Sequence, residues 1–185
     1  MANKTKTKLA QALRELLKKK PLSRITISEL TDMCGVNRMT FYYHFNDIYE
    51  LVEWGLQYEL QKQTANSEVS QMARADQLIH VFNAIKNDQE TILNIYHSVS
   101  LEQMEHFLFS LTIDYVRKLV NDRLGYNRIG DREKNFIIDF YNYAFIGLMI
   151  KWFKHDMDED PGVIVTHLDT MLEGVIELSI RNLSE

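Results

Sequence analysis

Arg38, Met39 and Thr40 form a short stretch whose side chains could contact the edges of DNA bases. An arginine can donate two hydrogen bonds to guanine, and a methionine or threonine methyl group can touch the methyl group of thymine. Contacts of this kind give a DNA-binding protein its sequence preference. Such a role requires an element that presents the three side chains together on an exposed surface.

Three side chains that could contact phosphate follow after Phe41, namely Tyr42, Tyr43 and His44. Hydroxyl and imidazole groups can reach phosphate oxygens, and those contacts fix the register of a protein on the duplex. A lone aromatic residue more often fills a small core. Phe41 and Phe45 are suited to that inward role, so the stretch predicts one helix with a buried face and a DNA-contacting face.

The flanking sequence predicts a helix-turn-helix around these residues. Thr26 with Glu29 three residues later is a capping box, so a helix should run from about residue 27 to 35, where Gly35 supplies the turn. Asn37 can cap a second helix over residues 38–45. The second helix of this motif enters the major groove and reads bases with its N-terminal residues. Thr26 and Asn37, the caps of the two helices, could also contact DNA.

The charge distribution supports binding of a polyanion at the N-terminal end. Residues 1–50 carry nine Lys and Arg against five Asp and Glu, a net charge of +4, whereas the whole chain has a net charge of −5. The local patch, and not the total charge, meets the DNA. Lys4, Lys6 and Lys8 begin a helix predicted over residues 4–20, which Pro21 ends, and they could hold phosphates.

The remainder of the chain predicts an all-α effector and dimerisation domain over residues 51–185, behind a DNA-binding domain over residues 1–50. Hydrophobic residues make up 45% of the sequence, which is enough for a buried core, and only two prolines and seven glycines interrupt it. A fourth helix should run from Asn46–Asp47 to about Gln63, followed by a polar linker. Amphipathic helices are predicted at residues 75–87, 88–99, 101–124, 131–155 and 161–182.

Residues 25–51, ITISELTDMCGVNRMTFYYHFNDIYEL, resemble the N-terminal domain of TetR-type transcriptional regulators. The matching positions are Thr26, Leu30, Gly35, Val36, Thr40, Phe41, Tyr42, His44, Phe45 and Leu51. The resemblance implies an all-helical homodimer with a small DNA-binding domain and a larger, variable effector domain. Thr31 and Cys34 replace small residues of the family pattern. Ile48 replaces a lysine that commonly holds a phosphate, which predicts weaker and less salt-dependent DNA binding.

Residues 136–176 look like the C-terminal domain of a subgroup that includes regulators of dihydroxyacetone-kinase operons. In such branches the effector can be a protein partner. This resemblance keeps two kinds of effector open, a small molecule and a protein.

The last two predicted helices carry apolar positions suited to dimerisation. The final helix spaces its apolar residues by 4, 3, 4 and 3, which is a seam for packing on another helix. The alternative is that one seam faces the chain's own core. The predicted interface comprises Phe136, Phe140, Tyr143, Gly147, Ile164, Leu168, Met171, Val175 and Leu178.

An effector pocket, if the domain has one, should lie among the helices of residues 75–155. Aromatic and methionine side chains permit an apolar cavity there, although any one of them is more often a core residue. A lone histidine such as His97 is likewise more often a structural residue than a ligand contact. The candidates are Phe82, Ile85, Ile92, Tyr96, His97, Met104, Phe107, Leu108, Leu111, Tyr115 and Trp152.

Other classes of function have little support in the sequence. There is no phosphate-binding glycine loop and no nucleophile elbow, so an enzyme is not expected, and neither is a cofactor. Glu102, Glu105 and His106 could bridge a metal, but a solvated helix face explains them better. The single cysteine excludes an internal disulfide and fits a cytoplasmic protein, and no secretion signal or membrane span is expected.

The sequence therefore predicts a dimeric, DNA-binding transcriptional regulator, a ligand-responsive repressor that reads a palindromic double-stranded operator. Its effector is an unidentified small molecule or protein. The alternative is a co-activator or adaptor whose C-terminal domain docks a protein partner.

Overall fold

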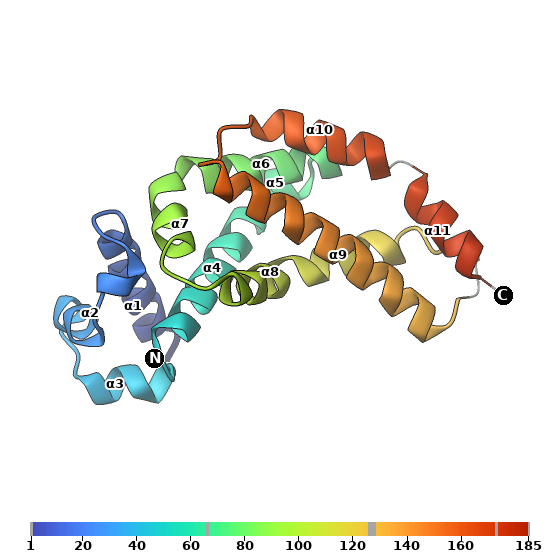
Figure 1. The fold of residues 1–185 in the computed structure, drawn as a ribbon. Coiled ribbons are helices and arrows are strands. Elements are labelled where there is room, and N and C mark those ends of the chain that lie inside the picture. The colour runs from blue at the N-terminus through green and yellow to red at the C-terminus, as the bar shows by residue number, and fades with distance from the viewer. Residues whose placement is uncertain (1, 66, 126–128, 173, 185) are drawn as a thin grey trace.

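The computed structural model describes residues 2–65, 67–125, 129–172 and 174–184, and every regular element within them is helical. This confirms the predicted fold class. The molecule is elongated, with the N-terminal helices gathered at one end and the last helix at the other (Figure 1).

The N-terminal bundle consists of α1 (Ala2–Leu17), a 3-10 turn, η1 (Leu22–Arg24), α2 (Ile27–Cys34) and α3 (Arg38–His44). Its core contains Leu9, Leu13, Leu30, Phe41 and Phe45, each at most 3% exposed. The first helix ends three residues earlier than predicted, at Leu17, because residues 18–20 turn the chain toward η1. The 3-10 turn buries Leu22 and was not predicted.

The caps of α2 and α3 form largely as predicted. Thr26 Oγ1 accepts a hydrogen bond from the Glu29 backbone N–H at 3.2 Å, but only this half of the capping box forms. The Glu29 carboxylate instead accepts two bonds from Lys20 Nζ, at 2.7 and 2.6 Å. Gly35 adopts φ +65, the left-handed conformation that glycine takes without strain, and this ends α2.

The fourth helix, α4 (Ile48–Thr64), joins the bundle to the rest of the chain and packs on α1 at one end. Asp47 caps it by accepting from the Glu50 N–H at 2.9 Å, so the helix begins where the sequence predicted. The helix runs across the domain boundary predicted at residue 50. A short helix, α5 (Ser67–Ser70), lies where the sequence predicted only a linker.

The C-terminal region contains α6 (Arg74–Asn87), α7 (Gln89–Tyr96), α8 (Leu101–Asn121) and α9 (Asp131–Lys154), each within three residues of its predicted bounds at both ends. The two longest, α8 and α9, pack against each other, and α4 packs on α6 and α8. The helix α9 alone among the described residues is long and apolar enough to cross a membrane by length and composition. Its packing against α8 and the burial of one of its faces fit a core helix instead.

The predicted final helix is in fact two helices, α10 (Pro161–Leu172) and α11 (Val175–Leu183). The break occurs at Gly174, whose φ of +73 is incompatible with a continuous α-helix. The 4-3-4-3 apolar seam is therefore divided between two axes. The helix α10 packs on α6, whereas α11 packs on α9 through Ile176 and Ile180.

Candidate nucleic-acid interface

The helix α3 presents the predicted base-reading residues on an exposed face. Phe41 is completely buried and holds the opposite face of the helix in the bundle. Arg38 lies in the first turn and is exposed, while Met39 and Tyr43 are 76% and 82% exposed. Exposed apolar side chains that gather on one surface can mark a site where another molecule binds.

Asn37 and Thr40 form a fixed pair at the start of α3. Asn37 Oδ1 accepts hydrogen bonds from the Thr40 backbone N–H at 2.8 Å and from its hydroxyl at 2.9 Å. The Thr40 hydroxyl hydrogen is therefore already used, which leaves its methyl group as the part free for a thymine contact. Asn37 is the cap that sets where the helix begins.

The aromatic residues of α3 pack edge-on to one another. Tyr42 lies 5.5 Å from the Phe41 ring centroid, and Tyr43 lies 5.0 Å from the ring centroid of His44. Tyr42 and Tyr43 are exposed and His44 is half-buried. These contacts limit the rotation of the rings, and the exposure of both tyrosines leaves them accessible to another molecule.

The start of α1 lies next to α3 and brings its lysines to the same end of the molecule (Figure 1). Lys4 and Lys8 are exposed. Lys6 is held differently from the prediction, because its Nζ lies 4.9 Å from the Phe45 ring centroid and 5.9 Å from that of Trp54. This cation–π contact was not foreseen, since Trp54 lies one helix further along the chain.

The three departures from the family pattern have local explanations. Thr31 is buried and its hydroxyl lies 2.9 Å from the carbonyl oxygens of Ile27 and Ser28. Cys34 Sγ lies 3.5 Å from the Lys8 carbonyl oxygen, and burial raises the pKa of this thiol. Ile48 begins α4 and packs half-buried against the core, so this helix start offers a methyl group where a lysine would offer a charge.

Hydrogen bonds join the N-terminal bundle to α7. Arg14 Nε donates to Asp88 Oδ2 at 3.0 Å, and Asp88 Oδ1 accepts from the Thr91 hydroxyl at 2.8 Å. Asn94 Nδ2 donates to the Leu17 carbonyl at 2.7 Å, at the last residue of α1. We call these contacts the α1–α7 junction. It was not predicted, because the two bonds that connect the bundle to the α7 region join residues 74 and 77 positions apart.

The predicted dimer residues lie mostly on the surface. Phe136, Phe140 and Tyr143 are 65%, 61% and 51% exposed along one side of α9, where Gly147 is also exposed. Met171, Val175 and Leu178 are exposed around the α10–α11 break. Leu168 is half-buried, and Ile164 packs against the chain's own core.

Most of the predicted pocket residues are packed in the core and do not line an open space. Phe82, Met104, Phe107, Leu108 and Trp152 are buried in the main core, and Ile85, Ile92 and Tyr96 pack against it. His97 is exposed after α7, and Leu111 and Tyr115 are half-buried on α8. Trp152 Nε1 donates to the Glu159 carbonyl at 3.0 Å, which fixes its ring.

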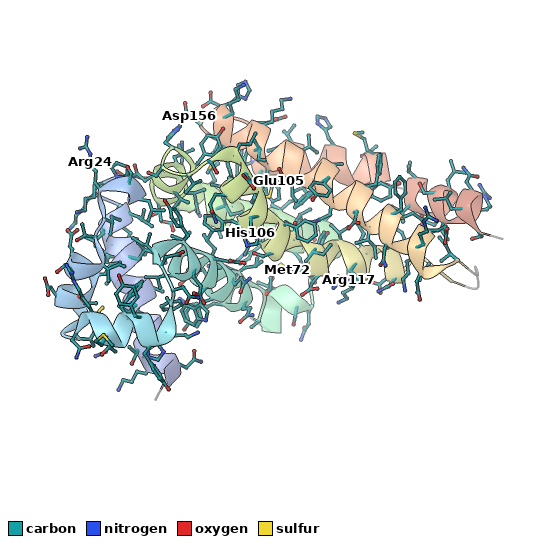
Figure 2. All side chains as sticks on the ribbon, turned by 60° about the horizontal axis from the view of Figure 1, so that its bottom comes forward. Arg24, Met72, Glu105, His106, Arg117 and Asp156 are labelled. Carbon is teal, nitrogen blue, oxygen red and sulfur yellow. The ribbon has the colours of Figure 1, made fainter. Side chains whose placement is uncertain are left out.

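Two open hollows occur elsewhere on the surface. One of about 670 Å³ lies between α8 and α9, lined by Ser100, Glu102, Gln103, Glu105, His106, Phe109 and Tyr143. Glu105 and His106 come from α8 (Figure 2), and His106 Nε2 lies 3.5 Å from Glu53 Oε2. No three His, Cys, Asp or Glu side chains among the described residues lie close enough to hold a metal. The other hollow, of about 520 Å³, lies beside Phe136 and Leu183.

Two family profiles match the chain and together cover most of it. Residues 9–53 match the profile described as "Bacterial regulatory proteins, tetR family". Residues 75–174 match a second, described as "Transcriptional regulator C-terminal region". No curated protein sequence matches the chain.

Several solved structures share the fold over nearly the whole chain. The dihydroxyacetone kinase operon activator DhaS has 17% identity and a TM-score of 0.64, with 98% of each chain covered. RolR in complex with resorcinol has 16% identity and a TM-score of 0.62, covering 100% of this chain and 97% of its own. NalD of Pseudomonas aeruginosa, the secondary repressor of the MexAB-OprM multidrug efflux pump, has 16% identity and a TM-score of 0.52, covering 100% and 99%. At these identities the likeness shows the fold.

Proposed function

Because the chain belongs to the TetR family of bacterial transcriptional regulators, we propose that it is a homodimer that binds a palindromic DNA operator and releases it in response to an effector. The observation that carries this proposal is the exposed face of α3. A capped helix holds an arginine, a methionine and two tyrosines outward on a rigid aromatic base. The expected location is the cytoplasm, where the operator is.

In the proposed complex, α3 lies in the major groove. Arg38 donates to guanine, and Met39 with the Thr40 methyl group contacts thymine methyl groups. Tyr42, Tyr43 and His44 contact phosphates, joined from neighbouring elements by Thr26, Lys4 and Lys8. Lys6 contributes chiefly by holding α1 against the rings of Phe45 and Trp54.

The proposed dimer buries the exposed apolar side of α9 together with α11. Phe136, Phe140 and Tyr143 form a contiguous row at four- and three-residue spacing, which matches helix-on-helix packing. Two subunits are needed because the recognition helices of a dimer read half-sites about 34 Å apart, one turn of DNA. A change in the effector domain that alters this spacing would release the operator.

Repression is the proposed sign of regulation. NalD, which has the same fold, is a repressor, and RolR binds the small molecule resorcinol. The α1–α7 junction supports a response to an effector, since it joins the DNA-reading end directly to the effector region.

Arg38→Ala tests the proposed DNA contact. A fluorescence anisotropy titration with DNA from upstream of the gene should show a loss of preference for the palindromic site over random duplex. Each lost arginine–guanine contact should weaken specific binding by about 1–3 kcal/mol per half-site. Arg24→Ala is the matched control, because Arg24 is exposed on the side of the bundle away from α3 (Figure 2). If Arg38→Ala and Tyr42→Ala both bind the site as tightly as the wild type, the assigned roles are wrong.

A second candidate function is that of a co-activator or adaptor that docks a protein through its C-terminal domain. The similarity to DhaS, an operon activator, over 98% of both chains favours this alternative, as does the uncharged Ile48. The two functions differ in what changes DNA binding. A stoichiometric protein partner that raises transcription supports the adaptor, whereas a small molecule that releases DNA supports the repressor.

A further inference from the structure

A buried amide in the middle of α9 lacks a hydrogen-bond partner. Asn142 is 0% exposed, and its Nδ2 is the one buried side-chain nitrogen or oxygen without a partner in the part of the chain that the structure describes. An amide buried without a partner destabilises the fold, because it has lost its hydrogen bonds to water. Native proteins retain such groups rarely, and often for a functional reason.

Among the described residues, the only hydrogen-bond partner of the Asn142 side chain is Thr112 on α8. Thr112 Oγ1 lies 2.8 Å from Asn142 Oδ1 and also 2.8 Å from the Leu108 carbonyl oxygen. A hydroxyl has one hydrogen, so it donates fully to one of these acceptors. If it donates to Leu108, the Asn142 amide turns over and donates to Thr112, and the amide oxygen becomes unpaired instead. In both arrangements one polar atom of Asn142 is left over.

Thr112 and Asn142, hereafter the polar pair, separate two apolar clusters. The main cluster reaches the polar pair through Leu108 and Ile146, one turn away on α8 and α9. The second cluster begins one turn away in the other direction, with Val116 and Ile138. The leftover polar atom therefore lies at the boundary between two packed regions.

Tyr115 provides a second polar group beside this boundary. It lies one turn beyond Thr112 on α8, and its ring centroid is 6.5 Å from that of Phe145. Burial raises the pKa of the Tyr115 phenol, partly offset by Arg74 and Arg123. The ring is only half-buried and packs against the second cluster, so Tyr115 is partly open to solvent beside this boundary.

We propose that the polar pair and Tyr115 are the contact point of the effector, and that this effector is a small, uncharged aromatic molecule bearing a hydroxyl group. This inference rests on the proposed function of an effector-responsive regulator. A hydroxyl both donates and accepts, so it satisfies Asn142 in either orientation of the amide. The surrounding aliphatic and aromatic side chains favour a flat apolar body. A net charge is excluded, because the part of the chain that the structure describes buries no charged side chain that could compensate the desolvation of a charged effector.

The competing explanation is that Asn142 only fixes the register of α8 on α9, as a buried asparagine does in coiled coils. The two explanations differ in the absence of any ligand. A leftover amide costs stability, so Asn142→Leu should raise the midpoint of thermal unfolding of the ligand-free protein. A register residue would give the opposite result. Asn83→Leu on the exposed side of α6 is the control for the change in hydrophobicity.

Ligand discrimination is measured with phenol and toluene, which share a ring and differ in the hydroxyl. Isothermal titration should show the wild type binding phenol about ten-fold more tightly than toluene, the equivalent of one added hydrogen bond. Asn142→Leu and Thr112→Val should each reduce this preference to near unity. Thr112→Val keeps the side-chain shape, so it serves if Asn142→Leu does not fold.

Equal binding of phenol and toluene by the wild type would overturn the inference, as would a preference that survives both substitutions. Titration of the wild type with palindromic DNA separates this failure from a failure of the proposed function. If the protein binds the palindromic DNA but does not distinguish phenol from toluene, the proposed function stands and only the proposed effector contact point is wrong. Phenol that weakens DNA binding of the wild type, and not of Thr112→Val, supports both.

Discussion

Ile48→Lys should strengthen DNA binding and make it more dependent on salt. Ile48 is the first residue of α4, half-buried, directly after the exposed cap Asp47. A lysine stem can follow the same apolar contacts and place its ammonium beyond them, toward the phosphate backbone. A cation at a helix N-terminus is slightly unfavourable, by about 0.3–1 kcal/mol, so the folded protein should lose little stability.

The size of the effect follows from counterion release. Each added phosphate contact steepens the slope of log K against log salt by about 0.9, so a dimer with two lysines should change it by about 1.8. When the salt concentration rises from about 50 to 200 mM, the ratio of the DNA-binding constant of the variant to that of the wild type should therefore fall about twelve-fold. A protein that binds DNA as a monomer should show about half the slope change and only a three- to four-fold decrease.

Anisotropy titrations at several salt concentrations measure this slope directly. Ile48→Met is the matched control, because it keeps an unbranched apolar stem without the charge. Parallel slopes for Ile48→Lys and the wild type would refute the placement of the α4 start beside the phosphate backbone. A steeper slope with unchanged preference among sequences would support it, since phosphate contacts carry no direct sequence information.

Three further substitutions test the structure itself. Asn37→Ala should lower the free energy of unfolding by about 1 kcal/mol in urea titrations and weaken specific DNA binding, because the helix cap is lost. Asn37→Asp should retain the cap, and an unchanged unfolding midpoint in Asn37→Ala would count against it. Asp88→Asn should lower the free energy of unfolding by well under about 1 kcal/mol, since Arg14 is partly exposed, but it should speed hydrogen exchange in the last turn of α1. Equal exchange rates would mean that the α1–α7 junction does not stabilise that turn. Gly174→Ala should lower thermal stability by about 1–2 kcal/mol through the backbone alone, because no atom lies within 4 Å of the added methyl group, and Gly174→Asn should cost less.

The N-terminal bundle could be predicted closely because its signals are local. Thr26 and Asn37 each cap the helix that the sequence assigned to them, and Gly35 makes the turn. The fourth helix begins at the predicted place, where Asp47 is its cap. The interpretation of Glu29 was incomplete for a non-local reason. Its carboxylate could accept a hydrogen bond either from the Thr26 backbone N–H or from a lysine. The fold brings Lys20 Nζ to 2.7 Å from the carboxylate, and the lysine is the observed donor.

The break at Gly174 shows how a periodic pattern can mislead. The apolar spacing from Ile164 to Leu178 continues across the glycine, so periodicity alone predicted one helix. The structure turns there because Ile176 and Ile180 reach a different cluster from the one that α10 covers. A glycine inside a helix lowers its stability by about 1 kcal/mol relative to alanine. Gly174 therefore argued for a helix end, but the apolar periodicity was given more weight.

The interior polar contacts could not be predicted from sequence. Thr112 and Asn142 each occupy an ordinary position on an amphipathic helix, and their pairing depends on how α8 and α9 pack 30 residues apart. Pocket prediction had the same limit. Aromatic composition cannot distinguish side chains that fill a core, as Phe82 and Trp152 do at a ring separation of 5.2 Å, from side chains that line a space.

The hydrogen bond from Asn94 to the Leu17 carbonyl bears on whether the DNA-reading end can be moved to another protein. The final turn of α1 obtains a partner for its main chain from α7, and Arg14 obtains its counter-ion there as well. A chimera that keeps the first four helices and exchanges the remainder would leave the Leu17 carbonyl without Asn94 and would leave Arg14 only Glu59 of α4, at 3.7 Å, as a counter-ion. Grafting should therefore succeed only when α7 travels with the reading end, so the exchangeable unit in this chain extends to about residue 96.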